Sequence, residues 1–344
     1  MTGLRWGLIG ASDIASTRII PALRRVGQEP LAVLSSSAER GARFAVENDV
    51  SLSYTSLDAM LDRHDIDAVY ISTTNELHAE QAVAAAMAGK HVLCEKPLAM
   101  SIHDAQKILS ACDGAGVVLA VNHHLPAAGT HRKMRELIAQ GAVGKPLAVR
   151  VFHAVKLPDR LAGWRLQNPE RGGGVILDIT SHDAAAVQAL LGARALEVAA
   201  ISCSQGLWAA AVEDAVVSAM RFPEDVLVQT HDAFTVGYAG TGLEVHGTEG
   251  SIIARGVMTQ DPVGSLHLRD ANGEREIGPS DRDDLYDVTL SAFAEAVRGQ
   301  AAPIVDGQAG LQALAVALAA KESAQAGRTV AVDALLTGQL PHSG

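Results

Sequence analysis

The chain has 344 residues, which is enough for two domains, because single hydrophobic cores seldom grow beyond about 250–300 residues. Its 48% hydrophobic and 19% charged residues are typical of a globular protein and exclude a disordered one. The formal net charge of −11 and the absence of a Lys/Arg-rich run argue against a nucleic-acid partner. No apolar stretch approaches the roughly 20 residues of a membrane span, so we expect no membrane association.

The N-terminus and the cysteines bear on the compartment. Residues 1–6 lead directly into a strand-like run and carry no signal-peptide pattern. The three cysteines, Cys94, Cys112 and Cys203, have neither metal-binding nor disulfide spacing. We therefore expect a reduced cytoplasmic protein with no metal site.

The first strand, turn and helix form a candidate phosphate-binding unit. An apolar run at residues 6–10 precedes a helical pattern that extends to Arg25, with Asp13 as the expected N-cap. The glycine fingerprint of dinucleotide-binding turns is incomplete, because its three positions hold Gly10, Ser12 and Ala15. A helix N-terminus still presents N–H groups to a pyrophosphate. The candidate cofactor-binding residues here are Gly10, Ala11, Ser12, Asp13, Ile14 and Ala15.

The end of the second strand indicates which dinucleotide is bound. NAD sites usually place Asp or Glu there, for the ribose 2′-hydroxyl. In this chain Ser35 and Ser36 end the strand and Arg40 follows. Hydroxyl groups and a guanidinium suit a 2′-phosphate, which favours NADP(H). The alternative is a capping serine beside a solvated arginine.

A third strand at residues 67–72 ends in a polar turn that leads into a helix. Because the carboxyl ends of parallel strands bind ligands in such sheets, we expect the turn to contact ribose or phosphate, although helix capping also explains it. The candidates are Thr73, Thr74, Asn75, Glu76, Leu77 and His78.

The next strand, at residues 91–94, ends on Glu95-Lys96-Pro97. Proline cannot continue a central strand, and it favours an extended conformation for Lys96 at the binding edge. A helix at 102–115 and a strand at 117–121 follow. This alternation predicts a doubly wound parallel sheet in a dinucleotide-binding domain at residues 1–122.

The remainder, residues 123–344, has a different pattern. A helix is expected at 129–140, and strands follow one another without crossover helices, which implies a mainly antiparallel sheet. Two helices are expected near residues 285–297 and 308–326. The predicted strands lie at residues 146–155, 196–203, 215–222, 226–233, 243–246, 251–254 and 266–268.

One segment of this half carries candidate catalytic groups. Three glycines at 172–174 precede Asp178 and His182, which lie on one face if the segment is helical. A carboxylate near an imidazole raises the pKa of the imidazole and orients it, which suits proton transfer. The alternative is a capping aspartate beside a partly buried histidine.

These features together resemble the glucose–fructose oxidoreductase, inositol dehydrogenase and MocA family. The Glu95-Lys96-Pro97 strand end and the Asp178/His182 pair are the most specific points of similarity. Within the family the chain is most similar to NADPH-dependent reductases of a cyclic keto sugar. The segments that carry this similarity are 6–12, 72–78, 91–97, 122–124, 163–165 and 173–180.

The resemblance implies a Rossmann domain followed by an α+β domain on an open, mainly antiparallel sheet. It implies hydride transfer between NADP(H) and a sugar or polyol, with Lys96, His182 and Asp178 as catalytic residues. The residues alone do not distinguish whether Lys96 or His182 donates the proton. Asn122, Trp164, Arg165 and Tyr286 are assigned to the cofactor site with Glu95 and Lys96 by the same resemblance.

Three alternatives follow from this assignment. The first function is reduction of a cyclic ketose; the second is NAD(P)-dependent oxidation of an inositol or aldose. The third is a dinucleotide or sugar sensor without turnover, since the fold alone does not establish catalysis. The resemblance also suggests a homo-oligomer formed through the open sheet.

Overall fold

The computed structural model describes residues 3–206 and 212–339. It divides into two compact units. The first unit contains Met1–His124 and Tyr286–Leu311, and the second contains Leu125–Leu285 and Gln312–Gly344. The chain thus returns to the first unit after completing most of the second, whereas the sequence suggested a single boundary at residue 122, which stays a prediction.

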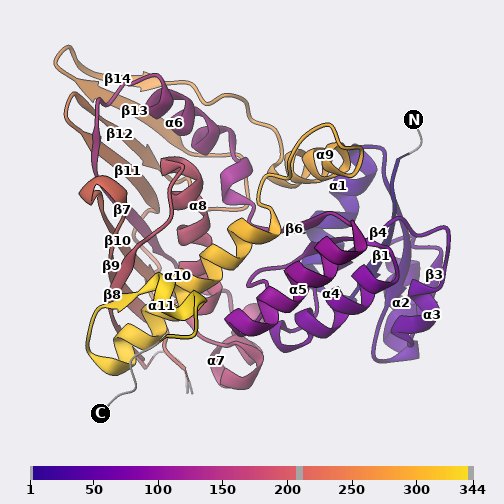
Figure 1. The fold of residues 1–344 in the computed structure, drawn as a ribbon. Coiled ribbons are helices and arrows are strands. Elements are labelled where there is room, and N and C mark those ends of the chain that lie inside the picture. Colours follow the sequence, from indigo (N-terminus) through magenta and orange to yellow (C-terminus); the bar gives the residue numbers. More distant parts are fainter. Residues whose placement is uncertain (1–2, 207–211, 340–344) are drawn as a thin grey trace. The chain divides into compact units, whose positions relative to one another are not determined.

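The first unit is built on a six-stranded sheet in the order β3-β2-β1-β4-β5-β6 (Figure 1). All its strand pairs are parallel, as the alternating sequence pattern predicted. This is the strand order of dinucleotide-binding folds. The strands are β1 (Arg5–Ile9), β2 (Glu29–Leu34), β3 (Leu52–Tyr54), β4 (Ala68–Ile71), β5 (His91–Cys94) and β6 (Leu119–Val121).

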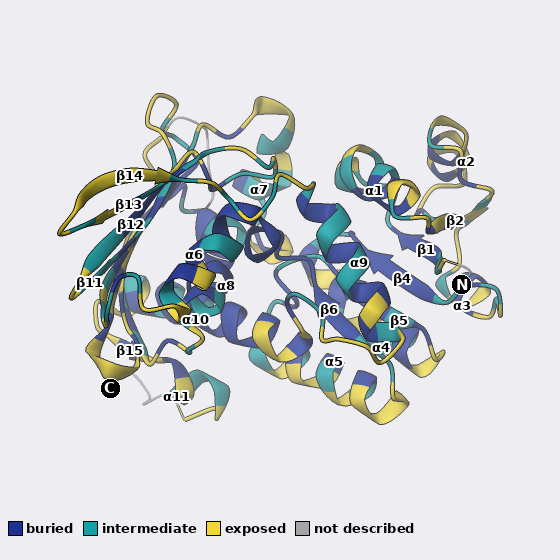
Figure 2. Cartoon of the chain, turned by 90° about the horizontal axis from the view of Figure 1, so that it is seen from above, coloured by how far each residue is buried: buried dark blue, intermediate teal, exposed yellow. Residues whose placement is uncertain are grey.

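Helices cover both faces of this sheet, so its central strands are buried and read as apolar runs. In Figure 2 the residues of β1 and β4 are dark blue along almost their whole length. The helical segments are η1 (Ala15–Ile19), α1 (Ile20–Arg25), α2 (Ala38–Glu47), α3 (Leu57–Leu61), η2 (Asn75–Leu77), α4 (His78–Met87) and α5 (Ile102–Ala115). The helix predicted at 102–115 is confirmed.

The returning segment completes the first unit. Helix α9 (Leu285–Val297) packs into the same apolar cluster as β1 and α1, where Phe293 lies 5.1 Å from the ring of Trp6. The N-terminus of α10 (Gly307–Ala326) then crosses β6, and Ala120 forms an isolated bridge with Asp306. Distant parts of the sequence therefore fix β6, the strand that directly precedes Asn122.

The second unit is built on a nine-stranded sheet in the order β14-β13-β12-β11-β7-β10-β9-β8-β15. Its described pairs are antiparallel except for β10 and β7, which are parallel. The mainly antiparallel prediction is confirmed. The strands are β7 (Pro146–Ala154), β8 (Glu197–Cys203), β9 (Ala215–Arg221), β10 (Leu227–Ala233), β11 (Gly242–Gly247), β12 (Gly250–Arg255), β13 (Ser265–Asp270), β14 (Gly273–Ile277) and β15 (Val330–Ala331).

Three short strands, β3, β14 and β15, were not predicted. Strand β14 is the clearest case, because four of its five residues are exposed, three of these are charged, and it lies at the edge of the sheet. A strand with no buried face lacks the alternation by which strands are recognised in a sequence.

Helices cover one face of the nine-stranded sheet, with α8 beside the central strand β7 and α10 nearer β8, toward one edge (Figures 1 and 2). The helical segments of this unit, apart from α10, are η3 (Leu125–Ala127), α6 (Gly129–Ala139), η4 (Asp159–Leu161), α7 (Ala162–Gln167), η5 (Pro169–Arg171), η6 (Ile176–Thr180), α8 (Ser181–Leu191), η7 (Pro223–Asp225) and α11 (Val332–Leu336).

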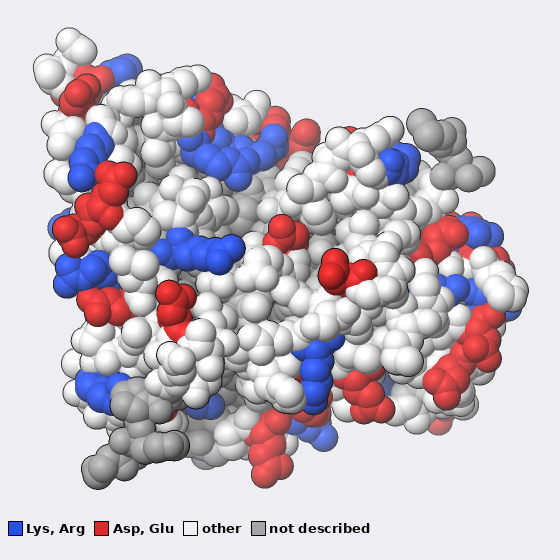
Figure 3. Space-filling view, in the orientation of Figure 1, with Lys and Arg blue, Asp and Glu red and all other residues white. Residues whose placement is uncertain are grey.

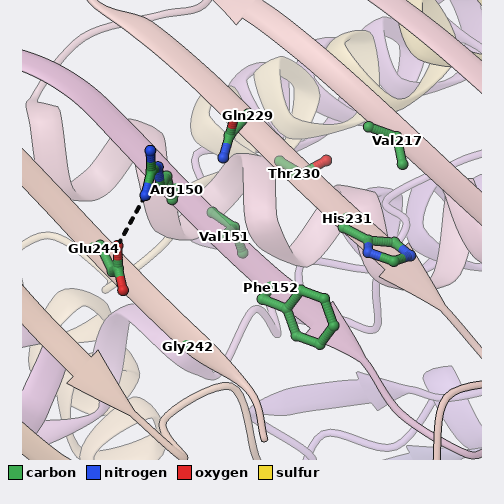
Figure 4. A pocket seen from close by; sticks show the side chains of 9 residues that line it. All are labelled: Arg150, Val151, Phe152, Val217, Gln229, Thr230, His231, Gly242 and Glu244. Carbon is green, nitrogen blue, oxygen red and sulfur yellow. Dashed lines mark ion pairs between the residues drawn. The ribbon is translucent and has the colours of Figure 1, made fainter. Parts of the chain in front are cut away.

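The other face of this sheet presents alternate residues to solvent. Ile201 is 80% exposed and Val217 is 53% exposed. A hollow of about 390 Å³ lies on this face, where Phe152 and His231 pack edge to face and Arg150 pairs with Glu244 (Figure 4). The face is therefore partly apolar and partly polar.

Charged side chains of both signs are mixed over the surface drawn in Figure 3. Such mixing produces no extended field of one sign on that face of the molecule.

Helix α10 approaches β6 so closely that glycine is required. A Cβ at Gly310 would lie 2.3 Å from Cγ2 and 2.9 Å from Cβ of Val121. We predict that Gly310→Ala lowers the free energy of unfolding by about 1–3 kcal/mol, as overpacking of a core does.

Gly114, which is exposed on α5 with open space around it, is the matched control. Gly114→Ala should raise stability by about 0.4–1 kcal/mol, because alanine restricts the unfolded chain. Urea denaturation compares the two; equal effects would contradict the close approach.

Candidate functional site

The turn after β1 has the shape of a phosphate cradle. Gly10 has φ +115°, and a Cβ there would lie 3.0 Å from the carbonyl oxygen of Ser72. Ser12 Oγ lies 2.7 Å from Ser72 Oγ and accepts a hydrogen bond from the N–H of Ala15 at 3.2 Å. Ser12, and not Asp13, is therefore the capping side chain, because its oxygen reaches the N–H three residues on. Ala15 is buried in the apolar core beside the sheet.

The other turn residues differ in exposure. Asp13 is exposed, whereas Ala11 and Ile14 are half-buried. The first glycine of the fingerprint is thus required by backbone conformation, and a serine takes the second position and adds a hydroxyl group.

Ser35, Ser36 and Arg40 lie together at the end of β2. The guanidinium of Arg40 donates to Ser35 Oγ from Nε at 3.0 Å and to Ser36 Oγ from Nη2 at 3.1 Å. Ser37 caps α2 by accepting from the N–H of Arg40 at 3.3 Å. This cap orients the first turn of α2 so that Arg40 points back to the strand end. The cluster combines one positive charge with two hydroxyl groups and contains no carboxylate.

The buried side chain of His78 supports the turn after β4 from the protein interior. His78 is fully buried, and its Nδ1 lies 2.9 Å from the carbonyl oxygen of Pro97. Burial lowers the pKa of this imidazole, so a neutral ring donates to that carbonyl. His78 therefore links the turn to the end of β5.

The rest of this turn is more accessible. Thr73 donates to Gln81 at 2.6 Å and Thr74 donates to Glu76 at 2.8 Å. Asn75 is buried, and Leu77 is 39% exposed.

The end of β5 carries a hydrogen-bonded carboxyl next to Lys96. Tyr70 donates to Glu95 Oε1 at 2.5 Å, and Asn122 Nδ2 donates to the same oxygen at 2.6 Å. Burial raises the pKa of Glu95 although both bonds and the Lys96 charge oppose it. The Lys96–Pro97 peptide bond is cis. The sequence did not reveal this contact of Tyr70 with the candidate site residue Glu95, because Tyr70 lies in an otherwise apolar strand.

Asn122 directly follows β6, and only one of the two polar atoms of its side-chain amide is hydrogen-bonded among the described residues. It is 2% exposed, and among the described residues its Oδ1 has no hydrogen-bond partner. His123 follows, and burial lowers its pKa to about 3, with a smaller contribution from the charge of Lys96. A neutral imidazole and an unsatisfied amide oxygen thus lie near Lys96 at the carboxyl ends of these strands.

Tyr286, at the start of α9, is 1% exposed and stacks on His124 with ring centroids 5.7 Å apart. The structure thus brings this residue of the returning segment next to the end of β6. Only the resemblance had indicated it, because it is remote in sequence.

In the second unit, Trp164, Arg165 and Asp178 lie together. The guanidinium of Arg165 is 4.7 Å from the ring centroid of Trp164, and its Nε is 3.5 Å from Oδ2 of Asp178. Gly173 makes this arrangement possible, because a Cβ there would lie 2.9 Å from the carbonyl oxygens of Trp164 and Arg165. The glycine-rich segment is therefore a close-packing device beneath these side chains.

Asp178 lies in the π-helical turn η6, and His182 lies in the first turn of α8. His182 is 6% exposed. Both lie in helical segments, as predicted, but Asp178 is in a π-helical turn, so the segment that joins them is not a continuous α-helix. Such turns occur frequently at functional sites. The next residue, Asp183, is fully buried and lies 2.7 Å from His153 Nδ1, an interaction that the sequence did not reveal.

The described residues also bear on metal binding and on membrane insertion. Within residues 3–206 and 212–339, no group of three or more His, Cys, Asp or Glu side chains could hold a metal ion. No helix among these residues is long and apolar enough to cross a membrane.

Comparison with known proteins agrees with this geometry. Residues 4–123 match the model described as "Oxidoreductase family, NAD-binding Rossmann fold", and residues 135–332 match "Oxidoreductase family, C-terminal alpha/beta domain". The chain is 52% identical to a 1,5-anhydro-D-fructose reductase of Ensifer adhaerens over 329 residues, which are 96% of this chain and 98% of the relative.

Two further matches are more distant. A myo-inositol 2-dehydrogenase of Thermotoga maritima is 26% identical, with 97% of this chain and all of the relative covered. The crystal structure of an aldose-aldose oxidoreductase from Caulobacter crescentus is 25% identical with a TM-score of 0.87, and the match covers 96% of this chain and 99% of that one. The chain therefore belongs to the Gfo/Idh/MocA oxidoreductase family, with an NAD(P)-binding Rossmann part and a C-terminal α/β part.

Proposed function

We propose that this protein uses NADPH to reduce the C2 ketone of 1,5-anhydro-D-fructose, or of a closely related cyclic keto sugar, to the alcohol. For 1,5-anhydro-D-fructose the product is 1,5-anhydro-D-mannitol. The observation that carries the substrate assignment is the 52% identity to the Ensifer adhaerens reductase over almost the whole of both chains.

The first unit fits a dinucleotide. The Gly10 turn has a positive φ of +115° and packs closely against the backbone of Ser72, as a glycine of a dinucleotide-binding turn does, and the unsatisfied Oδ1 of Asn122 is an acceptor for a polar ligand group. Candidate contacts are the turn residues Gly10 to Ala15, the loop from Thr73 to His78, Glu95, Lys96, Asn122 and Tyr286, with Trp164 and Arg165 from the second unit.

Arg40, Ser35 and Ser36 support NADPH over NADH, since a positive charge with two hydroxyl donors matches a 2′-phosphate. When bound, the reduced nicotinamide supplies the hydride for the carbonyl carbon.

The side chains of Lys96 and His182 act on the carbonyl oxygen of the substrate, where negative charge develops as the hydride is transferred. We assign polarisation of this oxygen to the ammonium of Lys96 and proton donation to His182, following the family resemblance. Asp178, whose Oδ2 pairs with Nε of Arg165 at 3.5 Å, orients the sugar hydroxyls or His182.

The competing activity is oxidation of an inositol or aldose, which the similarity to the Thermotoga maritima dehydrogenase favours. Initial rates with 1,5-anhydro-D-fructose and NADPH should exceed those with myo-inositol or glucose and NADP⁺. The opposite order would select the dehydrogenase, and tight NADPH binding without turnover of any keto sugar would select a sensor.

The catalytic assignment predicts that Lys96→Ala and His182→Ala each lower kcat by about 10²–10⁴-fold, the usual contribution of a proton-transfer or polarising group. The dissociation constant for NADPH, measured by fluorescence titration, should change little. Lys107→Ala, at an exposed lysine of α5, is the control and should keep full turnover. Unchanged turnover in either site variant would exclude the assigned role.

The cofactor assignment predicts that Arg40→Ala weakens NADPH binding by roughly 1.5–3 kcal/mol, or about 10- to 150-fold, through loss of one charged hydrogen bond. Binding of NADH should be unaffected. Arg43→Ala, in the same helix and likewise exposed but without a bond to Ser35 or Ser36, should change neither. Equal weakening of both cofactors by Arg40→Ala would show that Arg40 only stabilises the turn.

We also propose that the protein forms a homo-oligomer and that the solvent-facing side of the nine-stranded sheet is its interface. The exposed apolar residues Ile201 and Val217 support this proposal, because they are register partners on β8 and β9 beside the hollow, and contiguous exposed apolar surface can pack against a second copy.

Analytical ultracentrifugation tests this interface. The protein should sediment as an oligomer, and Val217→Glu should shift it to the monomer, because a buried unpaired charge opposes association. Val46→Glu, at an apolar residue of α2 that is 84% exposed, is the control and should leave the oligomer intact. A wild-type monomer, or an unaffected Val217→Glu oligomer, would refute this interface.

A further inference from the structure

Two carboxyl groups lie buried together beneath the segment that carries His182. Asp183 belongs to the first turn of α8 and Asp232 to β10, and both side chains are completely inaccessible to solvent. Asp183 Oδ1 lies 2.7 Å from Nδ1 of His153 in β7. Asp232 Oδ2 accepts a hydrogen bond from Thr180 Oγ1 at 2.5 Å.

Each carboxyl group has one oxygen that accepts no hydrogen bond from the described residues. Oδ2 of Asp183 and Oδ1 of Asp232 are buried, and neither has a donor among the residues that the structure describes. The two carboxyl groups lie within hydrogen-bonding distance of each other. Two ionised carboxylates in this position would repel and leave both oxygens unsatisfied, whereas one proton between them supplies the missing hydrogen bond.

The surroundings favour retention of that proton. Burial raises the pKa of Asp183 to about 7, and burial together with the neighbouring Asp183 raises the pKa of Asp232 well above its usual range. The titratable neighbours are His153 of β7 and, next to it, His131 of α6. Burial lowers the pKa of His131 to about 4, so this imidazole is neutral at pH 7.

The pair is joined to the chain on both sides of His182. Asp232 bonds to Thr180, two residues before His182, and its partner Asp183 is the residue directly after it. Strands β7 and β10 are neighbours in the middle of the nine-stranded sheet, so Asp232 and His153 come from rigid elements. Side chains held in this way can keep a reactive group within the narrow geometry that catalysis needs.

We propose that Asp183 and Asp232 share one proton at neutral pH and that this pair is a positioning device for His182. Asp232 fastens the π-helical turn through Thr180 and the first turn of α8 through Asp183. The positioning role rests on the proposed function of His182, whereas the shared proton does not.

The shared proton sets the sign of a pH effect on stability. The native pair holds a proton that the unfolded chain, with an aspartate pKa of 3.8, releases at low pH. Because the native pair binds more protons than the same residues of the unfolded chain, its contribution to stability is greatest at acidic pH and falls as pH rises from about 4 through about 7. Asp232→Asn replaces the proton by an amide N–H donor, so the fall in the urea midpoint over this range should become shallower. Asp225→Asn, at the exposed turn before β10, should keep the wild-type slope.

Infrared spectroscopy at pH 7 detects the proton directly. The difference spectrum between the wild type and Asp232→Asn should contain the C=O band of one protonated carboxyl group, and the difference spectrum for Asp225→Asn should not. A wild type without that band, or a band that persists in both Asp232→Asn and Asp183→Asn, would overturn the shared proton whatever the substrate is.

Replacement of Asp232 by leucine tests positioning. Asp232→Leu removes the bonds to both Thr180 and Asp183, so it should shift the NMR resonances of the His182 ring, assigned by comparison with His182→Ala, while Asp225→Asn leaves them in place. It should also lower kcat at least about tenfold below that of Asp232→Asn, with the NADPH dissociation constant unchanged. Unshifted His182 resonances would overturn positioning. Shifted resonances in a protein whose wild type reduces no keto sugar would retain positioning and refute the proposed function instead.

Discussion

The parallel sheet of the first unit imposes the main constraint on this protein. Because its strands run in one direction, their carboxyl ends meet at one edge, where each chain segment must turn. Gly10, Ser35, Lys96 and Asn122 all stand at or just after such ends. Their proximity follows from strand order, although they are spread over more than a hundred residues of sequence.

The turns at this edge are stabilised by side chains that face the protein interior. His78 donates to the carbonyl of Pro97 and so couples the turn after β4 to the end of β5. Tyr70 and Asn122 hold Glu95 next to Lys96 from the strands on either side. The groups proposed to contact cofactor and substrate therefore rest on a second set of buried hydrogen bonds, whose loss would disturb geometry before it disturbed the fold.

In the second unit, close glycine packing and buried polar side chains hold the candidate site residues in place. Its glycine-rich segment packs against backbone carbonyls, which brings Arg165 to Asp178. The start of α8 is held from the sheet by Asp232 and His153. Buried carboxyl groups are costly unless they are paired or protonated, so their presence directly beside His182 is informative about where precise geometry is needed.

The sequence alone determined the broad architecture and the local chemistry. Alternating apolar runs and helical patterns predicted the parallel sheet, successive strands predicted the antiparallel one, and Ser35, Ser36 and Arg40 indicated a binding preference within one strand end and helix start. These signals are local, because periodicity and turn residues report only the conformation of a few neighbouring positions in the sequence. Only the tertiary structure revealed the return of Tyr286 to the first unit, the bonds of Tyr70 and Asn122 to Glu95, and the pairing of Asp183 with Asp232. Such contacts join residues between 25 and 162 positions apart, and no periodic pattern records them, because burial and strand neighbours are decided by the packing of the whole chain.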